Sequence, residues 1–476
     1  MIAVDCYSSL AEAAYLRQDV NALNLASARP DPFSTFEFYE NFLRHDECFP
    51  GGQGMHLWFL TAFIDDELVG YLVLKQVKYK IMGLATSKVS FLVTHDTDRP
   101  HLVARAEHQN PVSIAFYQYL LGRQQEWSFL EFQQQDNTSA LFPPPRAAAL
   151  HDHLVSQWTG LDNGTIRLRW ASLQDYFKSL SKSLYSNIRR QTHHLFDAGK
   201  VELLSSSHPS TTPALLELYL SIEAHSWKSK ANVNISHHPQ HIEYIKGLLD
   251  PLQPMRISIQ VLLLDGIPIA GLICGSFRND LYALHMVYDD EMNRLAPGST
   301  LIMMGMRQAI DGHYACFNLL SGFGYFKHRW LADMTETHVT QIYRKGSLPY
   351  WRRIIGDRVR EVFSFGLDHA TRLFNPLRRK VSVHAGQPNP PGTVPKPQRS
   401  AEERRQIAAL IATIRDSEGE HLNTAALRAV MPFDVQPATP GKTNTAMAPA
   451  VAEKHPALLA ASKKSGHSQW HHENAE

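Results

Sequence analysis

The chain has 476 residues, of which 44% are apolar and 20% are charged. This composition is typical of globular proteins. The length is enough for about two or three domains. The 47 basic and 46 acidic side chains leave a net charge of +1. An overall electrostatic attraction to nucleic acid or acidic lipid is therefore excluded, and any such attraction has to be local.

The cysteines and the N-terminus bear on the compartment. Cys6, Cys48, Cys274 and Cys316 are too sparse for a disulfide scaffold and too far apart for a paired metal site, which favours a reducing compartment. The first residues, MIAVDCYSSL, lack the basic start and apolar run of a secretory signal. No stretch reaches the roughly 18 uninterrupted apolar residues of a spanning helix. We therefore expect a cytoplasmic protein.

A faint internal repeat runs from residue 1 to about 380. In each half, an acidic or glycine turn lies between two alternating apolar runs, at Asp65–Gly70 and at Asp265–Ala270, and predicts a β-hairpin. A proline that opens a helical pattern follows each hairpin, at Pro111 and at Pro297, and an apolar strand comes next. The repeat predicts a duplication at the level of the fold.

The second half carries the clearer pattern. It predicts a helix over about 298–313 and strands over about 256–265, 267–278, 280–289, 315–321 and 336–345. A mostly antiparallel sheet with one β–helix–β crossover is a mixed α/β (α+β) fold rather than a Rossmann array. No G-x-G-x-x-G or Walker A run occurs, so these dinucleotide and phosphate sites are not supported.

Two C-terminal segments differ from the rest. Over 351–382, apolar residues from Trp351 to Phe363 recur at helical spacing among many arginines and predict a basic amphipathic helix. This helix either lies on the inner, anionic face of a membrane or packs on the second domain. Residues 383–476 are rich in Pro, Gly and Thr and predict a largely disordered tail. One helix is expected within it, at Ala401–Arg415, either as a docking segment or as part of a dispensable tail.

Four segments of the second half occur in a recognisable order and spacing. They are Leu184–Gln191, Asp265–Gly271, Tyr288–Leu301 and Gly322–Trp330. With them the second half resembles the acetyltransferase domain of the CelD/BcsL family, a branch of the GNAT superfamily related to FemAB-type peptidoglycan transferases. The resemblance implies tandem GNAT-like domains, with a degenerate domain over 1–170 and a catalytic domain over 171–350.

The resemblance also implies an activity. We expect an N-acyltransferase that takes its acyl group from acetyl-CoA or another acyl-CoA and acts on a carbohydrate or cell-envelope precursor. The sequence departs from the family where Asn318 replaces an Asp, where acids near Phe323 and Gly324 are missing, and where Tyr325 stands one position early. Two alternatives therefore stay open: a FemAB-like transferase that uses aminoacyl-tRNA, and a non-catalytic accessory protein of polysaccharide biosynthesis.

Coenzyme A needs a pyrophosphate site and a slot for its pantetheine arm. The helix start after Pro297 offers unpaired backbone N–H groups and a partial positive charge. The predicted contacts there are Arg294, Gly298, Ser299, Thr300 and Leu301. An ordinary turn before a packed helix is the alternative. The pantetheine slot is expected between the strands at 281–289 and 316–321.

The predicted catalytic residues are His285, Tyr325 and Lys327. His285 alternates with Leu281, Ala283 and Val287 on one strand face and can act as the base, or it is a core histidine. In GNAT enzymes a Tyr placed like Tyr325 gives a proton to the leaving sulfur; otherwise this ring only packs. Lys327 matches a family Lys and can bind an anionic acceptor or the coenzyme phosphates, or it lies on the surface.

Four further residues are predicted to bind the acceptor. Arg189 and Arg190 lie on one basic helix, Trp227 can stack on a sugar, and Asn318 lies in the slot strand at 316–321. A solvated helix face and a core Trp are the alternatives. No metal is expected, because the cluster His237, His238 and His241 lacks a nearby Cys or acid group. No nucleic-acid partner is expected.

Overall fold

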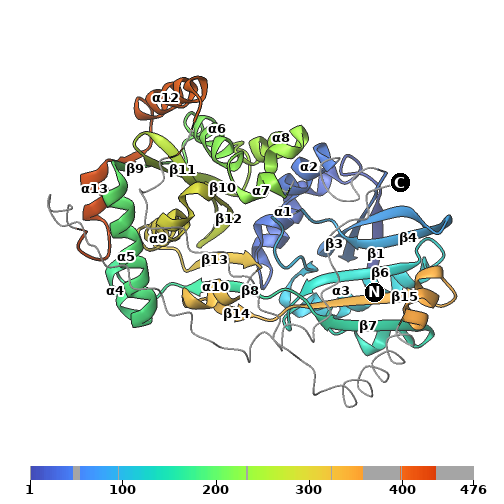
Figure 1. The fold of residues 1–476 in the computed structure, drawn as a ribbon. Helices are drawn as coiled ribbons and strands as arrows, with labels where there is room; N and C mark the ends of the chain where they lie inside the picture. The colour runs from blue at the N-terminus through green and yellow to red at the C-terminus, as the bar shows by residue number, and fades with distance from the viewer. Residues whose placement is uncertain are drawn as a thin grey trace, which may run out of the picture. The chain divides into compact units, whose positions relative to one another are not determined.

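The computed structural model describes residues 2–46, 54–94, 96–148, 150–231, 234–322, 324–356, 397 and 399–435. All of them belong to one compact unit, Met1–Val435. It contains two mixed, eight-stranded sheets with helices packed against them (Figure 1). No helix among these residues is long and apolar enough to cross a membrane.

The first sheet has the strand order β1-β2-β3-β4-β6-β15-β7, and β5 pairs with β3. Its strands are β1 (Ala3–Tyr7), β2 (His56–Ile64), β3 (Glu67–Ile81), β4 (Leu84–Phe91), β5 (Val103–Ala104), β6 (Phe129–Gln135), β7 (His153–Thr159) and β15 (His338–Arg344). The helices of this half are α1 (Arg17–Ala26), α2 (Phe36–Arg44) and α3 (Gln109–Gly122).

The second sheet has the order β14-β8-β13-β12-β11-β10-β9-β16. Its strands are β8 (Asn163–Arg167), β9 (Val201–Ser206), β10 (Arg256–Leu264), β11 (Ile267–Phe277), β12 (Asp280–Tyr288), β13 (Cys316–Ser321), β14 (Asp333–Thr335) and β16 (Glu420–Leu422). Its helices are α4 (Leu173–Ser179), α5 (Lys182–Ala198), α6 (Thr212–Glu223), α7 (Trp227–Lys230), α8 (Pro239–Leu248), α9 (Pro297–Asp311), α10 (Gly324–Arg329), α12 (Ala401–Arg415) and α13 (Thr424–Ala429).

Both sheets repeat one scheme, so the predicted duplication and the mixed α/β class are confirmed. Three antiparallel strands, β2–β4 or β10–β12, lead through helix α3 or α9 to a strand parallel to the third, β6 or β13. The predicted hairpin turns are also confirmed. Asp65 and Asp66 have φ of 49° and 63°, and Asp265 and Gly266 have 51° and 75°, which is the geometry of a two-residue hairpin turn.

The two halves exchange strands. β8, which follows the first sheet in the chain, lies between β13 and β14 of the second sheet. β15, which follows the second sheet, lies between β6 and β7 of the first, where Figure 1 shows it in orange among blue and cyan strands. The strand predicted at 336–345 is therefore present but belongs to the first sheet, not the second. The division near residue 170 stays a prediction, and strands of both sheets cross it.

Part of the predicted tail is folded. The helix predicted at Ala401–Arg415 is confirmed as α12, which begins with a capping box of Ser400 and Glu403 and packs against α6. The β16 strand then pairs with β9. A disordered tail is therefore wrong for residues 399–435, because the isoleucines of α12 are buried in the core. Residues 436–476, and residues 357–396 with most of the predicted basic helix, lie outside the described residues.

The largest core cluster contains residues of both halves. Phe33 and Phe38 from the first half join Ile259 and Leu284 from the second. The rings of Phe33 and Tyr282 meet edge to face, with 5.8 Å between their centroids. The two halves therefore share apolar contacts as well as strands.

The exchange predicts that β15 stabilises the first half. Ile342 of β15 is fully buried in a cluster otherwise built from first-half residues. Ile342→Ala should lower the free energy of unfolding by about 2–5 kcal/mol, since it leaves a cavity there. Denaturant unfolding followed by circular dichroism measures this loss.

Leu84→Ala is the matched control, because Leu84 is 58% exposed. It should change the free energy of unfolding by no more than about 0.5 kcal/mol. Equal small losses in both variants would contradict the placement of β15 in the first core.

Candidate active site

The two parallel strands of the second sheet open into a V. β12 and β13 pair at Asp280–Tyr282 with Cys316–Asn318 and then separate, although both strands continue. The bend lies in β13, where Leu320 has φ of 58° and donates its backbone N–H to Asn318 Oδ1 at 2.8 Å. Asn318 is buried and also accepts from Asn163 Nδ2 at 3.3 Å. Its side chain shapes the strand, and its contact with substrate stays a prediction.

A β-bulge lies in β12 next to the opening. His285 pairs with Ile273, but the next pair joins Ala283 to Cys274, so Leu284 is the extra residue. The bulge shifts the alternation of side chains. The predicted common face of Leu281, Ala283, His285 and Val287 is therefore wrong: Leu281 belongs to the cluster under α9, whereas Leu284 and Val287 belong to the cluster shared with the first half.

His285 lies in a group of buried charged side chains. Its Nε2 is 2.7 Å from Asp96 Oδ1, with 11% of the His285 and 2% of the Asp96 side chain exposed. Glu223 of α6, Lys228 of α7 and His241 of α8 complete this group, which we call the His285 cluster. The rings of His241 and His285 lie 6.4 Å apart.

The charges of the cluster offset one another in part. Lys228 Nζ is 3.9 Å from Glu223 Oε1, and the Glu223 side chain is fully buried. Burial raises the pKa of Glu223, and the nearby Lys228 opposes this. Burial lowers the pKa of Lys228, and Glu223 and Asp96 oppose that shift. Proton-carrying groups are thus concentrated on the α6–α8 side of β12.

The start of α9 lies at the other side of the opening. A short 3-10 helix, η8 (Asp290–Leu295), leads to Ala296, which has φ of 47° and no side-chain cap for the helix. Gly298, Thr300 and Leu301 are buried and Ser299 is half-buried. The side chains of Thr300 and Leu301 are therefore packed inside, and the backbone N–H of Ser299 already donates to the carbonyl of Ala296 at 3.0 Å. The predicted helix start is confirmed, and phosphate binding stays a prediction.

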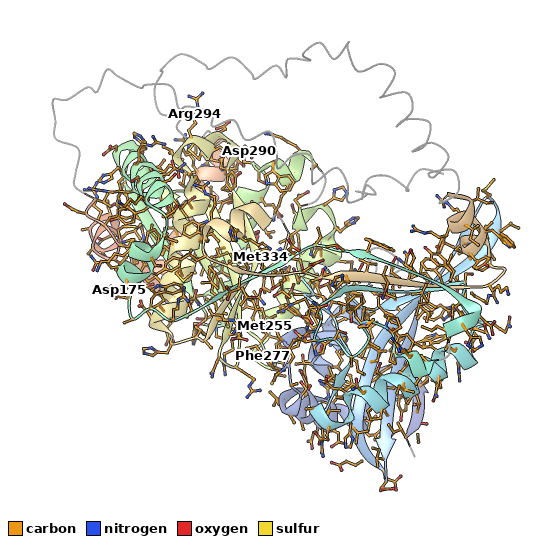
Figure 2. All side chains as sticks on the ribbon, turned by 90° about the horizontal axis from the view of Figure 1, so that it is seen from below. Asp175, Met255, Phe277, Asp290, Arg294 and Met334 are labelled. Carbon is orange, nitrogen blue, oxygen red and sulfur yellow. The ribbon has the colours of Figure 1, made fainter. Side chains whose placement is uncertain are left out.

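Charged residues surround η8. Arg294 is exposed, and Figure 2 shows it extending away from the ribbon beside Asp290. Lys230 of α7 pairs with Asp290 at 2.7 Å. The Asp289 carboxylate caps η8 through the backbone N–H of Glu291 and pairs with Arg399 at 2.8 Å, where both ion-pair side chains are fully buried. Arg399, from the C-terminal part of the chain, thus holds Asp289 in place at the start of η8, which leads into α9.

Lys327 is buried rather than on the surface. Its Nζ donates to the carbonyl of Leu320, at the bend of β13. Burial lowers the pKa of Lys327 to about 8, and Asp98 and Asp162 oppose this shift. Tyr325 lies in α10 beside it, but its side chain is outside the described part of the structure.

The predicted acceptor residues lie on the surface. Arg189 and Arg190 are exposed on α5, which packs against α9 and η8, and Arg190 donates to Asn187. Trp227 is 50% exposed at the start of α7, so the alternative of a core Trp is wrong. Arg189 and Arg190 belong to a different helix from the His285 cluster, whereas Trp227 directly precedes Lys228 of the cluster; both helices, α5 and α7, contact η8 before the start of α9.

The sequence alone missed Asp96, Glu223 and Lys228. A Thr-rich turn around Asp96 was a weak signal for an ordered loop, but nothing in the sequence joins it to β12. Among the residues that the structure describes, no group of three or more His, Cys, Asp or Glu side chains is placed to hold a metal.

Comparison with protein families identifies the enzyme class. Residues 182–328 match the family model of the acetyltransferase (GNAT) domain. The matched stretch contains β9–β13, α9, the open V and the His285 side of the site. The chain therefore carries a GNAT-type N-acyltransferase domain and is an enzyme of this class.

Solved structures are similar at low identity. FemX is 9% identical, over 68% of this chain and 95% of its own, with a TM-score of 0.45. A conserved protein from Bacteroides thetaiotaomicron is 11% identical, over 72% and 100%, with a TM-score of 0.44. A tandem GNAT protein from the clavulanic acid biosynthesis pathway is 12% identical, over 71% and 98%, with a TM-score of 0.40. No curated protein sequence matches the chain.

Lys327 predicts a pH dependence of stability. In the folded protein its pKa is about 8, against an ordinary value of 10.5. Between these values the unfolded chain holds a proton that the folded chain lacks, so stability rises with pH. From pH 7 to pH 10 the wild type should gain about 2 kcal/mol relative to Lys327→Met.

Urea unfolding of the wild type and of Lys327→Met at pH 7 and pH 10 gives the difference between their free energies of unfolding. The contributions of the other titrating groups cancel in this difference. A difference that stays constant from pH 7 to pH 10 would mean that Lys327 keeps its ordinary pKa when folded.

Proposed function

We propose that the protein is an acyl-CoA-dependent N-acyltransferase whose cosubstrate is acetyl-CoA or another acyl-CoA. The observation that carries the proposal is the V between β12 and β13, which opens between the start of α9 and the His285 cluster. A thioester in this opening has backbone N–H groups on one side and proton acceptors on the other. The proposed acceptor is a carbohydrate or cell-envelope precursor, as in the CelD/BcsL family.

The pantetheine arm is proposed to lie along the separated edges of β12 and β13, which carry unpaired backbone groups. The pyrophosphate would then reach the backbone N–H of Gly298 and the hydroxyl of Ser299 at the start of α9, with Arg294 adding charge. The first half is a poorer candidate for this role. Its β4 and β6 also stop pairing, but Arg99 covers the end of β6 through contacts with Gln134 and Asp136.

The reaction moves one proton and one acyl group. The acceptor nitrogen gives a proton to His285 and forms a bond with the thioester carbonyl carbon. The bond between this carbon and sulfur then breaks, and the thiolate takes a proton from Tyr325, so the products are an amide and a free thiol. The proton on His285 returns to the Tyr325 oxygen through solvent, so one proton has moved in total from nitrogen to sulfur. We propose that a backbone N–H of β12 beyond Tyr282, where β12 no longer pairs with β13, stabilises the oxyanion that forms in between.

The positive groups around the opening suit an anionic acceptor. Lys327 lies at the bend of β13, and Arg189 and Arg190 lie on α5 beside η8. An exposed Trp227 on α7 offers a flat apolar face to a sugar ring. Their arrangement supports a phosphorylated or nucleotide-linked sugar as the acceptor.

A substitution at the start of α9 tests the coenzyme site. An added Cβ at Gly298 would lie 3.4 Å from Tyr288 and 3.8 Å from Met286. The further methyl groups of Val would crowd both side chains and displace the helix start. Gly298→Val should therefore weaken acetyl-CoA binding at least about tenfold, or about 1.4 kcal/mol, in calorimetric titration.

Gly298→Ala is the control, because its single Cβ makes an ordinary van der Waals contact. It should bind acetyl-CoA with nearly wild-type affinity. Wild-type affinity in a folded Gly298→Val variant would count against this site.

A further inference from the structure

The loop between β4 and β5 carries a carboxylate of the first half into the site of the second. Asp96 lies in this loop, has 2% of its side chain exposed, and approaches His285 of β12 to 2.7 Å. The loop belongs to the first half and His285 to a strand of the second sheet. Because the GNAT match begins at residue 182, Asp96 lies outside the matched domain.

The loop around Asp96 is tightly bonded. The backbone N–H groups of Asp96 and Thr97 donate to Thr94 Oγ1 at 3.0 Å and 3.2 Å. Two residues on, Asp98 accepts from Asn163 Nδ2 of β8 at 2.8 Å and from Ser321 Oγ of β13 at 3.0 Å. The backbone of the loop that carries Asp96 is thus held by its own turn and, through Asp98, by two strands of the second sheet.

Other charged groups face His285 from each element packed against it. Glu223 comes from α6, Lys228 from α7 and His241 from α8. Glu223 has its own partners, the backbone N–H of Ile235 at 2.7 Å and Lys228 at 3.9 Å. Asp96 is the carboxylate that comes nearest to the imidazole: its Oδ1 lies 2.7 Å from Nε2 as an ion-pair contact, and the ring N–H is not aligned with it as a hydrogen bond.

We propose that Asp96 is a positioning residue that holds His285 protonated at Nε2, so that Nδ1 is the nitrogen that accepts the proton of the acceptor. The partner of one ring nitrogen fixes which nitrogen carries the proton. During the reaction Asp96 stays ionised and compensates the charge of the imidazolium. This inference rests on the proposed role of His285 as the base, and it makes the first half a part of the active site.

A double-mutant cycle tests whether Asp96 acts through His285. Asp96→Asn should lower kcat about 10²-fold with unchanged affinity for acetyl-CoA, and His285→Gln should lower kcat at least as much. The variant with both changes should be no slower than His285→Gln alone. If kcat of the double variant fell by the product of the two single losses, Asp96 would act independently of His285, and the proposal would be overturned.

Glu131→Gln is the matched control. Glu131 is also a carboxylate of the first half, with 18% of its side chain exposed, but it pairs with Lys88 at 3.1 Å and not with a histidine. It should keep kcat within about threefold of the wild type.

Nitrogen-15 NMR of the His285 ring tests the pairing without turnover. The wild type should show the form protonated at Nε2, and Asp96→Ala should show a mixture of both forms. If His285→Gln keeps wild-type kcat, the proposed base is wrong, and the NMR result still decides the pairing. A ring protonated at Nδ1 in the wild type would overturn the role of Asp96.

A second inference concerns the tip of the β3–β4 hairpin. Met82 is 93% exposed, Leu84 58% and Tyr79 38%, with exposed Lys78 and Lys80 beside them. No Asp or Glu occurs between Glu67 and Asp96. The tip is therefore apolar and basic.

A second apolar and basic segment lies at the same end of the first sheet. The strand pairs place Lys88 beside Phe129 and Phe129 beside Tyr343, so residues 345–356 start where the hairpin extends beyond the sheet (Figure 1). Residues 348–356 are helical, and Trp351 and Ile355 are 52% and 58% exposed. Lys345 and Arg352 are exposed as well.

We propose that these two segments bind the surface of an anionic membrane. The apolar tips would enter the interface, and each basic residue near the surface would add a salt-dependent attraction. An anionic membrane suits these two segments, because the exposed charged side chains on both of them are positive.

Sedimentation with phosphatidylglycerol vesicles tests the surface. The wild type should pellet at low salt and be released at high salt, and the Met82→Asp/Leu84→Asp variant should bind at least about tenfold more weakly. Leu252→Asp is the control, since Leu252 is 83% exposed in the second half, and it should bind like the wild type. A wild type that ignores the vesicles overturns the proposal. So does self-association of the wild type that the double variant loses, because the surface would then join two copies of the chain.

Discussion

Each sheet depends on a strand that the other half of the chain supplies. β15 completes the first sheet between β6 and β7, and β8 completes the second between β13 and β14. Without these strands, the neighbouring backbone groups would lose their ladder partners, and an unpaired buried backbone group is costly. The exchange therefore ties the two halves together at the same place where β13 bends and the V opens.

The exchange also explains why charged groups can be buried between the halves. Asp98 accepts from Asn163 of β8 and from Ser321 of β13, while Arg29 and Arg99 pair with Asp136. A buried charge without its partner is strongly destabilising. These contacts form only if the two sheets keep a fixed position relative to each other. The exchanged strands β8 and β15 fix that position. A loop fixed in this way can carry Asp96 to His285 with the accuracy that a catalytic group needs.

The local elements were predictable because their signals are local. Asp65-Asp66 and Asp265-Gly266 can adopt the positive φ that a tight hairpin needs, and Pro297 marks the start of α9. Ile407, Leu410 and Ile414 identified α12 although its surroundings are rich in proline. The pairing of β15 with β6 was not predictable, since the same alternating pattern would fit either sheet. Likewise, the bulge at Leu284 has no sequence signal, so the face of β12 that carries His285 was misassigned.

Only single residues with reactive or phosphate-binding chemistry could be predicted from the sequence; their partners in space could not. A His on a strand and a Gly after a Pro are visible in a sequence, and both lie beside the opening. Asp96 was invisible as a partner of His285, because an acid in a loop is ordinary and the contact joins two sheets. Lys327 was visible, but its burial was not, because this depends on the bend of β13 and on β8 beside it.

The matched GNAT domain does not contain all that its site depends on. Asp96 and β8 precede residue 182, whereas β15 and Arg399 follow residue 328. Asp96 contacts the proposed base, β8 pairs with the bent strand β13, and Arg399 holds Asp289 at the entry to η8. Arg399 and Asp289 form a fully buried ion pair, which is retained only where the geometry around it is fixed. The proposed coenzyme site at α9 and the proposed base His285 thus both depend on residues outside the matched domain. We therefore expect the proposed acyl transfer to need the whole compact unit up to Val435 rather than the central domain alone.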